Sequence, residues 1–362
     1  MNRRLGRFGQ REMTACAALT ALNCGCFSID KRDLYRGGNI LHFATLLSLF
    51  AAFLLLELLT HLLRKTGAKS LGALCRRLPV PVRAVSLLLW AATLLLTVML
   101  PQVHFLQAMT GLLYPDAEPV VIALYLLPCL ILPACLGMET LVRTSRVLLP
   151  VTVIAALLTL ASYARHYRIE RLVPFFTTGH ALLGQSVISL LRFLPPVLIL
   201  LSAAPGGQGL QHVRRACRTG LWIGGGLTVA LELCLGLTYR YTELSEMEAP
   251  LYRLIAEIDT VSAAIRLDRI LLFVWTTASM LVCACALYAA SLLLSEVCDV
   301  GDIRPPAVLL GCASVFAALL LTHADGVLRL LERYGWVIAV LPVPFCLPLF
   351  SERRRLRWQS GS

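Results

Sequence analysis

Charged residues are scarce in this chain of 362 residues, where they make up 15% of the sequence, against about 25% in soluble domains. Acidic residues are the scarcer kind, since 21 Asp and Glu stand against 33 Lys and Arg and leave a net charge of +12. A soluble chain with so little charge could not cover its own core. The composition therefore excludes an ordinary cytosolic enzyme, a disordered protein and a collagen-like fibre.

Metal-binding and catalytic patterns are also missing. The close cysteine pairs, Cys24/Cys26 and Cys283/Cys285, have the spacing C-x-C instead of the C-x-x-C of zinc sites, and no H-E-x-x-H occurs. No nucleophile–base set stands out. Most of the 13 cysteines lie within apolar runs, so we interpret them as small core residues. We expect no metal, no cofactor and no enzymatic activity.

Apolar residues are abundant, at 58% of the chain, and they gather in runs bounded by charges, Pro or Gly. Because one membrane span takes about 20 apolar residues, the runs predict an all-helical polytopic protein of the lipid bilayer, with 1–362 as a single transmembrane domain. We place ten spans at about 10–28, 39–63, 84–112, 118–136, 139–163, 184–204, 219–239, 269–296, 306–323 and 329–350.

The distribution of basic residues predicts the orientation of these spans. Ten spans put both termini on one side, and that side holds 20 Lys and Arg residues against 12 on the other, with Arg192 inside a span. An excess of Lys and Arg marks the cytoplasmic side, so we predict cytoplasmic termini, including the basic tail 351–362. Nucleic-acid binding is disfavoured because no basic stripe is interleaved with exposed aromatic residues.

The ten spans divide into two groups of five, 1–163 and 184–350, which begin on opposite sides of the membrane as inverted repeats do. The first span of each group contains helix-breaking residues, in the runs Asn23–Cys26 and Leu194–Pro196. Prolines remove backbone donors, and freed carbonyls inside a membrane need a cavity or a polar partner. The pattern favours a paired break at matching depth; a simple kink at the two prolines is the alternative.

The longest segment predicted on the outer side is 240–268. Its apolar residues follow helical spacing, which predicts a short amphipathic helix lying on the outer surface of the bundle. They are Leu251, Leu254, Ile255, Ile258 and Val261.

One run of residues resembles the GerAB family of spore germination permeases. Gly137, Glu139 and Arg143, with Pro150 downstream, look like the G-x-E-x-x-x-R…P start of that family's fifth span. Gln10, just before the first predicted span, also fits the family.

A second stretch carries the same resemblance. The run Pro250–Tyr252, followed by Arg266–Asp268 and Trp275, is similar to the segment leading into the family's eighth span. The sequence departs from the family at both predicted breaks, because span one lacks a second glycine and span six carries Arg192 where the family often has a Gly-Glu pair.

The resemblance implies a fold of the amino acid–polyamine–organocation (APC) superfamily, a LeuT-like 5+5 inverted repeat with helices 1 and 6 broken. It also implies the B subunit of a nutrient germinant receptor, which acts with A and C subunits in the spore inner membrane of an endospore-forming bacterium. Two alternatives stay open: a secondary amino acid transporter, proton-coupled or not, and a scaffold subunit that binds no ligand.

We expect a small nutrient, such as an amino acid, to bind between the two breaks, where half-helix dipoles can hold its charged ends. Gly25 lets a ligand approach the backbone or serves close helix packing. Arg192 meets a ligand carboxylate, or it snorkels or forms a salt bridge. The predicted ligand-binding residues are Asn23, Cys24, Gly25, Cys26, Phe27, Arg192, Leu194, Pro195 and Pro196.

Two pairs of charged residues near span ends have either a structural or a gating role. Glu139 and Arg143 are four residues apart and share a helix face, as a structural ion pair or as part of a cytoplasmic gate. Arg266 and Asp268 lie at the outer end of span eight, where they anchor the outer helix or act as gate residues.

Carboxyl and hydroxyl groups inside the spans are candidates for ion coupling. Glu57 and Glu232 are able to accept protons in a coupling step, or they are paired or lie at the membrane interface. Thr276, Thr277 and Ser279 lie where sodium-coupled relatives of the implied fold hold a cation with hydroxyl oxygens. The alternative for such hydroxyls is a hydrogen bond to the backbone of their own helix.

Overall fold

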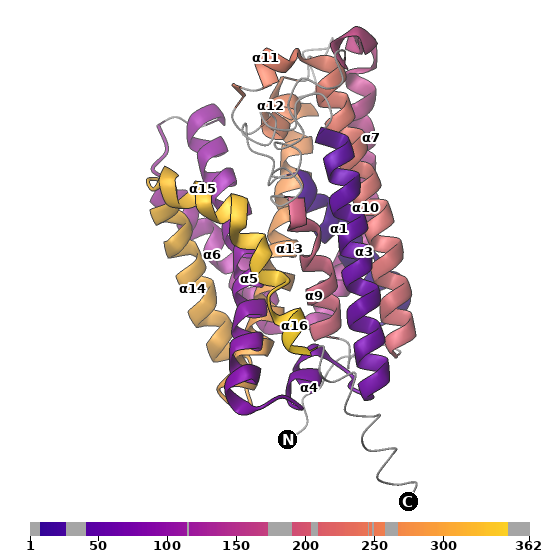
Figure 1. Ribbon diagram of the computed structural model, residues 1–362. Coiled ribbons are helices and arrows are strands. Elements are labelled where there is room, and N and C mark those ends of the chain that lie inside the picture. Colours follow the sequence, from indigo (N-terminus) through magenta and orange to yellow (C-terminus); the bar gives the residue numbers. More distant parts are fainter. Residues whose placement is uncertain are drawn as a thin grey trace, which may run out of the picture.

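The computed structural model describes residues 8–26, 41–113, 116–172, 190–203, 209–244, 246–247, 250–257 and 267–346. These residues are almost entirely helical, and none of them lies in a strand. The helices form an upright bundle (Figure 1). In chain order they are α1 (Gln10–Cys26), α3 (Leu41–Thr66), α4 (Leu71–Cys75), α5 (Val80–Ala108), the π-helical turn η2 (Met109–Leu113), α6 (Pro119–Leu136), α7 (Met138–Ser162), the 3-10 turns η3 (Ala164–His166), η4 (Ile169–Leu172) and η5 (Leu190–Phe193), α9 (Pro195–Ser202), α10 (Leu210–Thr238), α11 (Tyr241–Leu244), α12 (Pro250–Ala256), α13 (Leu267–Val297), α14 (Arg304–Leu321), α15 (Asp325–Tyr334), the 3-10 turn η7 (Gly335–Ala339) and α16 (Pro342–Cys346).

Seven helical stretches of the described chain are long and apolar enough to cross a bilayer. The chain is therefore an integral, multi-pass membrane protein, as its composition predicts. The stretches agree within about nine residues with the predicted spans two to five and seven to nine. They are Leu41–Thr66, Val80–Gly111, Pro119–Leu136, Met138–His166, Leu210–Thr238, Arg269–Val297 and Arg304–Leu321.

The other three predicted spans are not among these stretches. The first is helix α1, 17 residues of which belong to the described part of the chain, as far as Cys26. The sixth is divided between η5 and the eight-residue α9. The predicted tenth span, 329–350, is wrong as a single helix, because α15, η7 and α16 share its length. Gly335 starts the 3-10 turn and Pro342 starts α16, and a hydropathy criterion does not register such interruptions.

Segments predicted to be cytoplasmic gather at one end of the bundle, where α4 lies (Figure 1). Arg76, just after α4, lies 3.8 Å from Glu296 at the end of α13. Arg214, in the first turns of α10, pairs with Glu57 in the last third of α3. These contacts bring three of the basic segments together, as the alternation of spans predicts.

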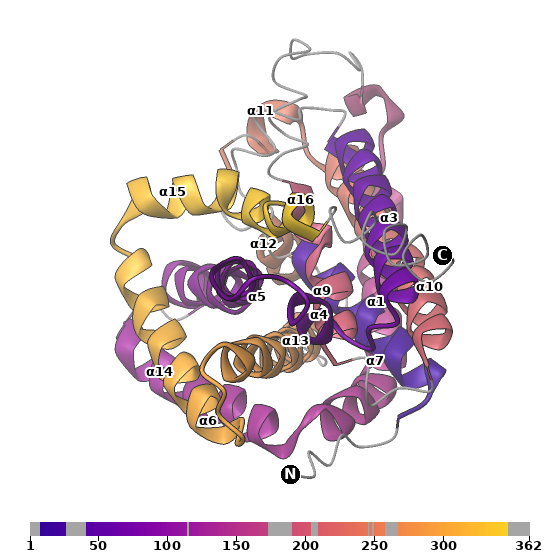
Figure 2. The same cartoon turned by 60° about the horizontal axis from the view of Figure 1, so that its bottom comes forward.

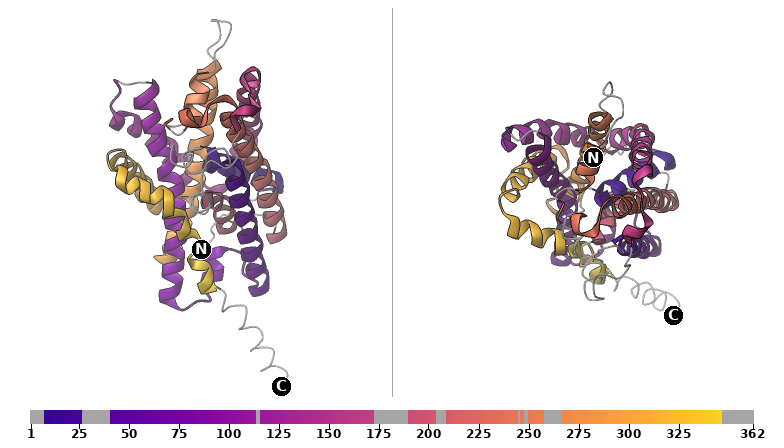
Figure 3. Two further views of the ribbon diagram at one scale, coloured as in Figure 1. Left: turned by 45° about the horizontal axis from the view of Figure 1, so that its top comes forward. Right: turned by 90° about the horizontal axis from the view of Figure 1, so that it is seen from above.

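The opposite end of the bundle carries α11 and α12 (Figures 1 and 3). The Tyr163 hydroxyl, at the end of α7, donates a 2.6 Å hydrogen bond to the Leu254 carbonyl of α12. The Tyr239 hydroxyl, just beyond α10, donates a 2.7 Å bond to Glu257. Burial, followed by this hydrogen bond, raises the pKa of Tyr239 well above its ordinary value, so the hydroxyl keeps its proton and remains a donor.

The amphipathic helix predicted in 240–268 is present as α12, in the part of that segment that the structure describes. Leu251, Leu254 and Ile255 are buried against the bundle. Ile258 and Val261 lie outside the described residues. The apolar face of α12 therefore covers the ends of the long helices instead of facing water.

Helix α1 lies inside the bundle, and 13 of its 17 residues are buried. It packs along α10, with α7, α9 and α13 on its other sides (Figure 2). Its buried side chains are mostly Ala, Cys and Leu, and small residues let helix backbones approach closely in a membrane. Helix α1 therefore makes the centre of the fold.

Glycines on α10 allow this close approach. A Cβ atom on Gly224 would lie 2.8 Å from the Ala21 Cβ and 3.0 Å from the Leu22 nitrogen of α1. Gly220, one turn earlier, faces Ala17 in the same way. The spacing Gly-x-x-x-Gly is typical of tightly packed membrane helices. Any larger residue at these positions must push α10 away from α1.

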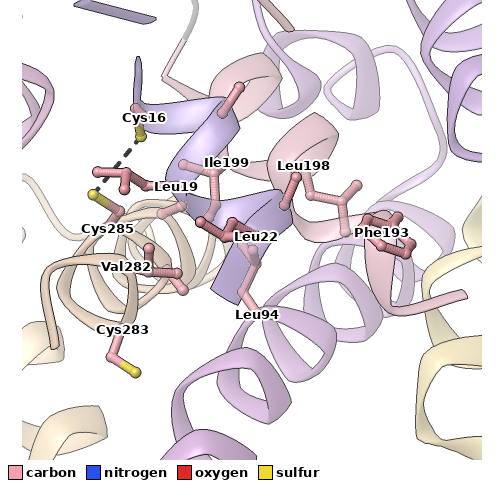
Figure 4. Packing of buried hydrophobic residues seen from close by; sticks show 14 of the residues in the cluster. Cys16, Leu19, Leu22, Leu94, Phe193, Leu198, Ile199, Val282, Cys283 and Cys285 are labelled. Atoms are coloured by element: carbon pink, nitrogen blue, oxygen red, sulfur yellow. Dashed lines mark hydrogen bonds between the residues drawn. The ribbon is translucent and has the colours of Figure 1, made fainter. Parts of the chain in front are cut away.

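The core beside α1 is made of side chains from α5, α9 and α13 (Figure 4). Leu22 of α1 lies near Leu94 of α5 and Leu198 of α9 (Figure 4). The Cys16 thiol lies 3.8 Å from that of Cys285 on α13. Such buried thiols fit the interpretation of the cysteines as small core residues.

Candidate functional site

The break predicted at Pro195 and Pro196 is the start of a helix. The two prolines occupy the first positions of α9, after the turn η5 and the linking residue Leu194. Proline is favoured there because the first N–H groups of a helix have no intrahelical partner. The Leu194 carbonyl accepts hydrogen bonds from the Val197 and Leu198 amides, at 3.0 and 3.2 Å. The prolines therefore separate two short helical pieces within a buried segment.

Arg192 lies in the last turn before this break and is buried. Its Nη2 atom is 3.7 Å from the Glu232 Oε1 atom of α10, and both side chains are 1% exposed. The Thr45 hydroxyl of α3 donates a 2.8 Å hydrogen bond to the same oxygen. Of the roles predicted for Arg192, the structure shows the salt bridge and not snorkelling. Glu232 joins η5, α10 and α3 at one point.

The run Asn23–Cys26, where a break is predicted, is helical as the last part of α1 that the structure describes, and it meets the same region. A Cβ atom on Gly25 would lie 2.6 Å from the Thr228 Cγ2 atom of α10 and 3.0 Å from the Phe193 ring of η5. The Cys26 thiol donates to the Thr228 hydroxyl at 3.8 Å. Gly25 therefore serves close packing in this conformation. The two runs predicted as breaks lie together, since Gly25 is close to Phe193 of η5; Phe27 lies outside the described residues.

Asn23 is the unusual residue of this region. It lies on α1, shortly before Gly25 and Cys26, which contact Thr228. Its side chain is 2% exposed, and neither amide atom has a hydrogen-bond partner among the described residues. Leaving a buried polar group unsatisfied costs about 1–3 kcal/mol. An amide held at that cost in an apolar core indicates a partner that is a ligand or an ordered water.

Gln102 of α5 has the same character, and sequence reasoning missed it. It is buried, and neither of its amide atoms has a partner in the part of the chain that the structure describes. The available signal was a carboxamide, Gln102 or Gln107, within the apolar run 84–112. The described bundle therefore holds two buried carboxamides able both to donate and to accept hydrogen bonds.

Of the charged residues predicted at the span ends, Glu139 and Arg143 lie at the start of α7. Glu139 and Arg143 form an ion pair of 2.5 Å in the first turns of α7, with both side chains partly exposed. Asp268 belongs to α13, but its side chain and Arg266 lie outside the described residues.

Glu57 differs from Glu232 in its surroundings. Its side chain is 40% exposed, and its Oε1 atom accepts a 3.0 Å hydrogen bond from the Arg214 Nε atom. The structure therefore shows the paired form of both carboxylates that were candidates for proton coupling.

The three hydroxyl residues of α13 do not face a common point. Thr277 is exposed, and its hydroxyl donates a 2.8 Å bond to the Phe273 carbonyl of its own helix. Thr276 is half-buried and Ser279 is buried. Among the described residues no group of three His, Cys, Asp or Glu side chains is placed to hold a metal.

Comparison with protein-family models assigns the chain to a family. The family model described as a spore germination protein matches residues 43–325. The chain belongs to this spore germination protein family. The resemblance to spore germination permeases is thereby confirmed over most of the chain. A comparison with curated protein sequences found no match.

Solved structures similar to this family member are transporters with the LeuT fold. A sodium-coupled sialic acid symporter in a substrate-bound, outward-open state superposes with a TM-score of 0.67, at 14% identity, over 95% of this chain and 78% of its own. A nucleobase-cation-symport-1 family transporter gives 0.56, at 11% identity, over 88% and 74%. A manganese transporter variant from Eremococcus coleocola gives 0.52, at 14% identity, over 94% and 78%. Identities this low establish the fold alone.

Proposed function

We propose that this spore germination permease is the B subunit of a nutrient germinant receptor. It binds a small nutrient, an amino acid in the first instance, and triggers germination together with A and C subunits. Its place is the spore inner membrane, with both termini and the tail 351–362 on the cytoplasmic side. The observation that carries a binding role is the buried, unpartnered amide of Asn23.

The chemistry around Asn23 suits an amphoteric ligand. Its amide can accept a hydrogen bond from an ammonium group and donate one to a carboxylate. Arg192 and Glu232, on the neighbouring η5 and α10, provide one positive and one negative charge without net charge. A bound zwitterion can exchange partners with this pair, its carboxylate meeting Arg192 and its ammonium meeting Glu232.

Such an exchange gives a signal as well as a binding site. Glu232 holds η5 to α3 and α10. A ligand that replaces part of this contact favours a conformation in which these helices are less tightly joined. A receptor needs this differential binding, because a ligand with equal affinity for both conformations shifts nothing.

The test replaces the amide side chain by an apolar side chain with the same number of non-hydrogen atoms. Asn23→Leu removes a desolvated polar group, so the receptor should accumulate to at least its normal level, whereas the nutrient concentration for half-maximal germination should rise at least about tenfold. Thr20→Val is the matched control, because Thr20 is buried on the same helix and its hydroxyl already donates to the Cys16 carbonyl at 2.7 Å. A normal dose response in Asn23→Leu spores would favour the scaffold function.

Two further measurements separate the receptor from its alternatives. Purification from spores should yield A and C subunits with this chain, and a ligand-responsive chain that purifies alone would contradict the obligate complex. Uptake of radiolabelled amino acids by this chain in vesicles would favour the secondary transporter, which its transporter-like fold makes the leading alternative. Germination defects without any change in uptake would favour the receptor.

A further inference from the structure

A polar cavity of about 120 Å³ lies between the end of α3 and the start of α10, away from the candidate ligand site. Its walls include Glu57, His61 and Arg64 from α3, and Gln211 and Arg214 from α10. These α3 residues lie on one face, since they are separated by three or four positions. The cavity is at the end of the bundle that also carries α4 and its basic flanks (Figure 1).

The charges of this cavity favour an anion. Two guanidinium groups, those of Arg64 and Arg214, stand against one carboxylate, that of Glu57. Glu57 is already engaged by Arg214 through the 3.0 Å bond to Nε. The Arg64 charge is therefore uncompensated within the cavity wall, and Gln211 adds a further donor. Guanidinium groups bind phosphate through paired N–H donors.

The surface next to the cavity is apolar on the side toward the middle of the bundle. Leu54 of α3, three residues before Glu57, is 56% exposed, and Trp222 of α10 is 58% exposed. The rings of Phe53 and Trp222 lie 5.2 Å apart, so the two helices stay adjacent here. Trp222 follows Arg214 by eight residues, or about 12 Å along the helix. Leu54 and Trp222 thus form an exposed apolar strip beside the cavity, about 12 Å from Arg214 along α10.

We propose that this cavity and strip form a binding site for an anionic phospholipid, with the headgroup phosphate beside Arg64 and Arg214 and an acyl chain along Leu54 and Trp222. A free phosphate compound would pair with the guanidinium groups of the cavity but would leave the apolar strip uncovered. Binding of a phospholipid therefore depends on its acyl chain, whereas binding of free phosphate does not. Because a bound lipid touches both α3 and α10, we expect an anionic lipid to stabilise the contact between these helices more than a neutral lipid does.

The experiment titrates the full-length protein in detergent with phosphatidylglycerol and, separately, with phosphatidylcholine, and counts the complexes by native mass spectrometry. Arg64→Gln should lower the preference for phosphatidylglycerol about fivefold, since one basic residue near an anionic lipid surface contributes about 1 kcal/mol. Arg215→Gln is the matched control: it removes the same charge from the exposed neighbour of Arg214, which does not line the cavity. Its effect should stay below about twofold.

Three results would overturn the proposal. One is an absence of preference for phosphatidylglycerol in the unmodified protein. Another is an equal loss in Arg64→Gln and Arg215→Gln, which would mean that general surface charge attracts the lipid. The third is displacement of the lipid by millimolar inorganic phosphate or glycerol 3-phosphate, which would make the cavity a site for free phosphate. The Glu57–Arg214 pair is left intact in both variants, so folding of the protein is preserved.

Discussion

Helix α10 carries an ion pair near each of its ends, and the two pairs lie in opposite settings. Arg214 pairs with Glu57 at the bundle's end, with side chains 42% and 40% exposed, whereas Glu232 pairs with Arg192 where both side chains are 1% exposed. If one residue of the exposed pair is replaced, water still solvates the charge of the other residue. The buried pair has no such solvent, so each charge depends on the other.

This difference shows that the same residue types have different functions at different depths. In the proposed lipid site the exposed pair stays intact, and the phosphate lies beside Arg64 and Arg214. The buried pair ties η5, α3 and α10 together and can exchange partners only with a ligand that brings its own charges. The candidate germinant site and the proposed lipid site are therefore the buried and the exposed forms of one kind of contact.

The largest expected effect is loss of one buried charge. Glu232→Gln keeps an acceptor for the Thr45 hydroxyl but leaves Arg192 without its carboxylate, which should cost about 3–5 kcal/mol of stability. The measurement is the unfolding midpoint of purified protein in detergent. The double variant Arg192→Gln/Glu232→Gln should recover much of the loss, because no single charge remains buried. A loss no larger than that of Glu57→Gln would remove the distinction between the two pairs.

A smaller effect is expected from substitution of the α10 glycines that pack against α1. Gly224→Ala puts a Cβ 2.8 Å from that of Ala21, and such overpacking costs about 1–3 kcal/mol. Gly226→Ala is the matched control, since no atom lies within 4 Å of its Cβ position. Equal midpoints for the two variants would contradict the close α1–α10 packing.

The smallest effect is expected at the exposed pair. Glu57→Gln should change stability by less than about 1 kcal/mol, and the change should shrink as salt is raised. The same unfolding assay, repeated at low and high ionic strength, measures both quantities. A loss above 3 kcal/mol that does not respond to salt would mean that Glu57 is as dependent on its partner as Glu232.

The sequence was sufficient for the local features of this fold. Spans such as Leu41–Thr66 and Leu210–Thr238 follow from length and hydropathy, which adjacent residues determine. The tenth span was predicted wrongly because Gly335 and Pro342 interrupt a run whose composition is still apolar. The number ten and the 5+5 repeat remain predictions.

The candidate site could be predicted only in part. The interruption before α9 was predicted from Pro195 and Pro196, since proline carries a backbone signal, whereas Gly25 lies within the helical part of α1. The partner of Arg192 was not predictable, because Glu232 is distant in sequence and looked equivalent to Glu57. Depth in the bundle separates these two carboxylates, and depth depends on the packing of α1 between the other helices.

The most direct test of the proposed function is ligand-dependent stabilisation of the purified protein. We predict that a germination-active amino acid raises the unfolding temperature of the unmodified protein, because it binds the folded state alone, and that Asn23→Leu abolishes this shift while Thr20→Val retains it. A shift of the same size and concentration dependence in Asn23→Leu would contradict the account, since the nutrient would then bind elsewhere than beside the buried amide of α1.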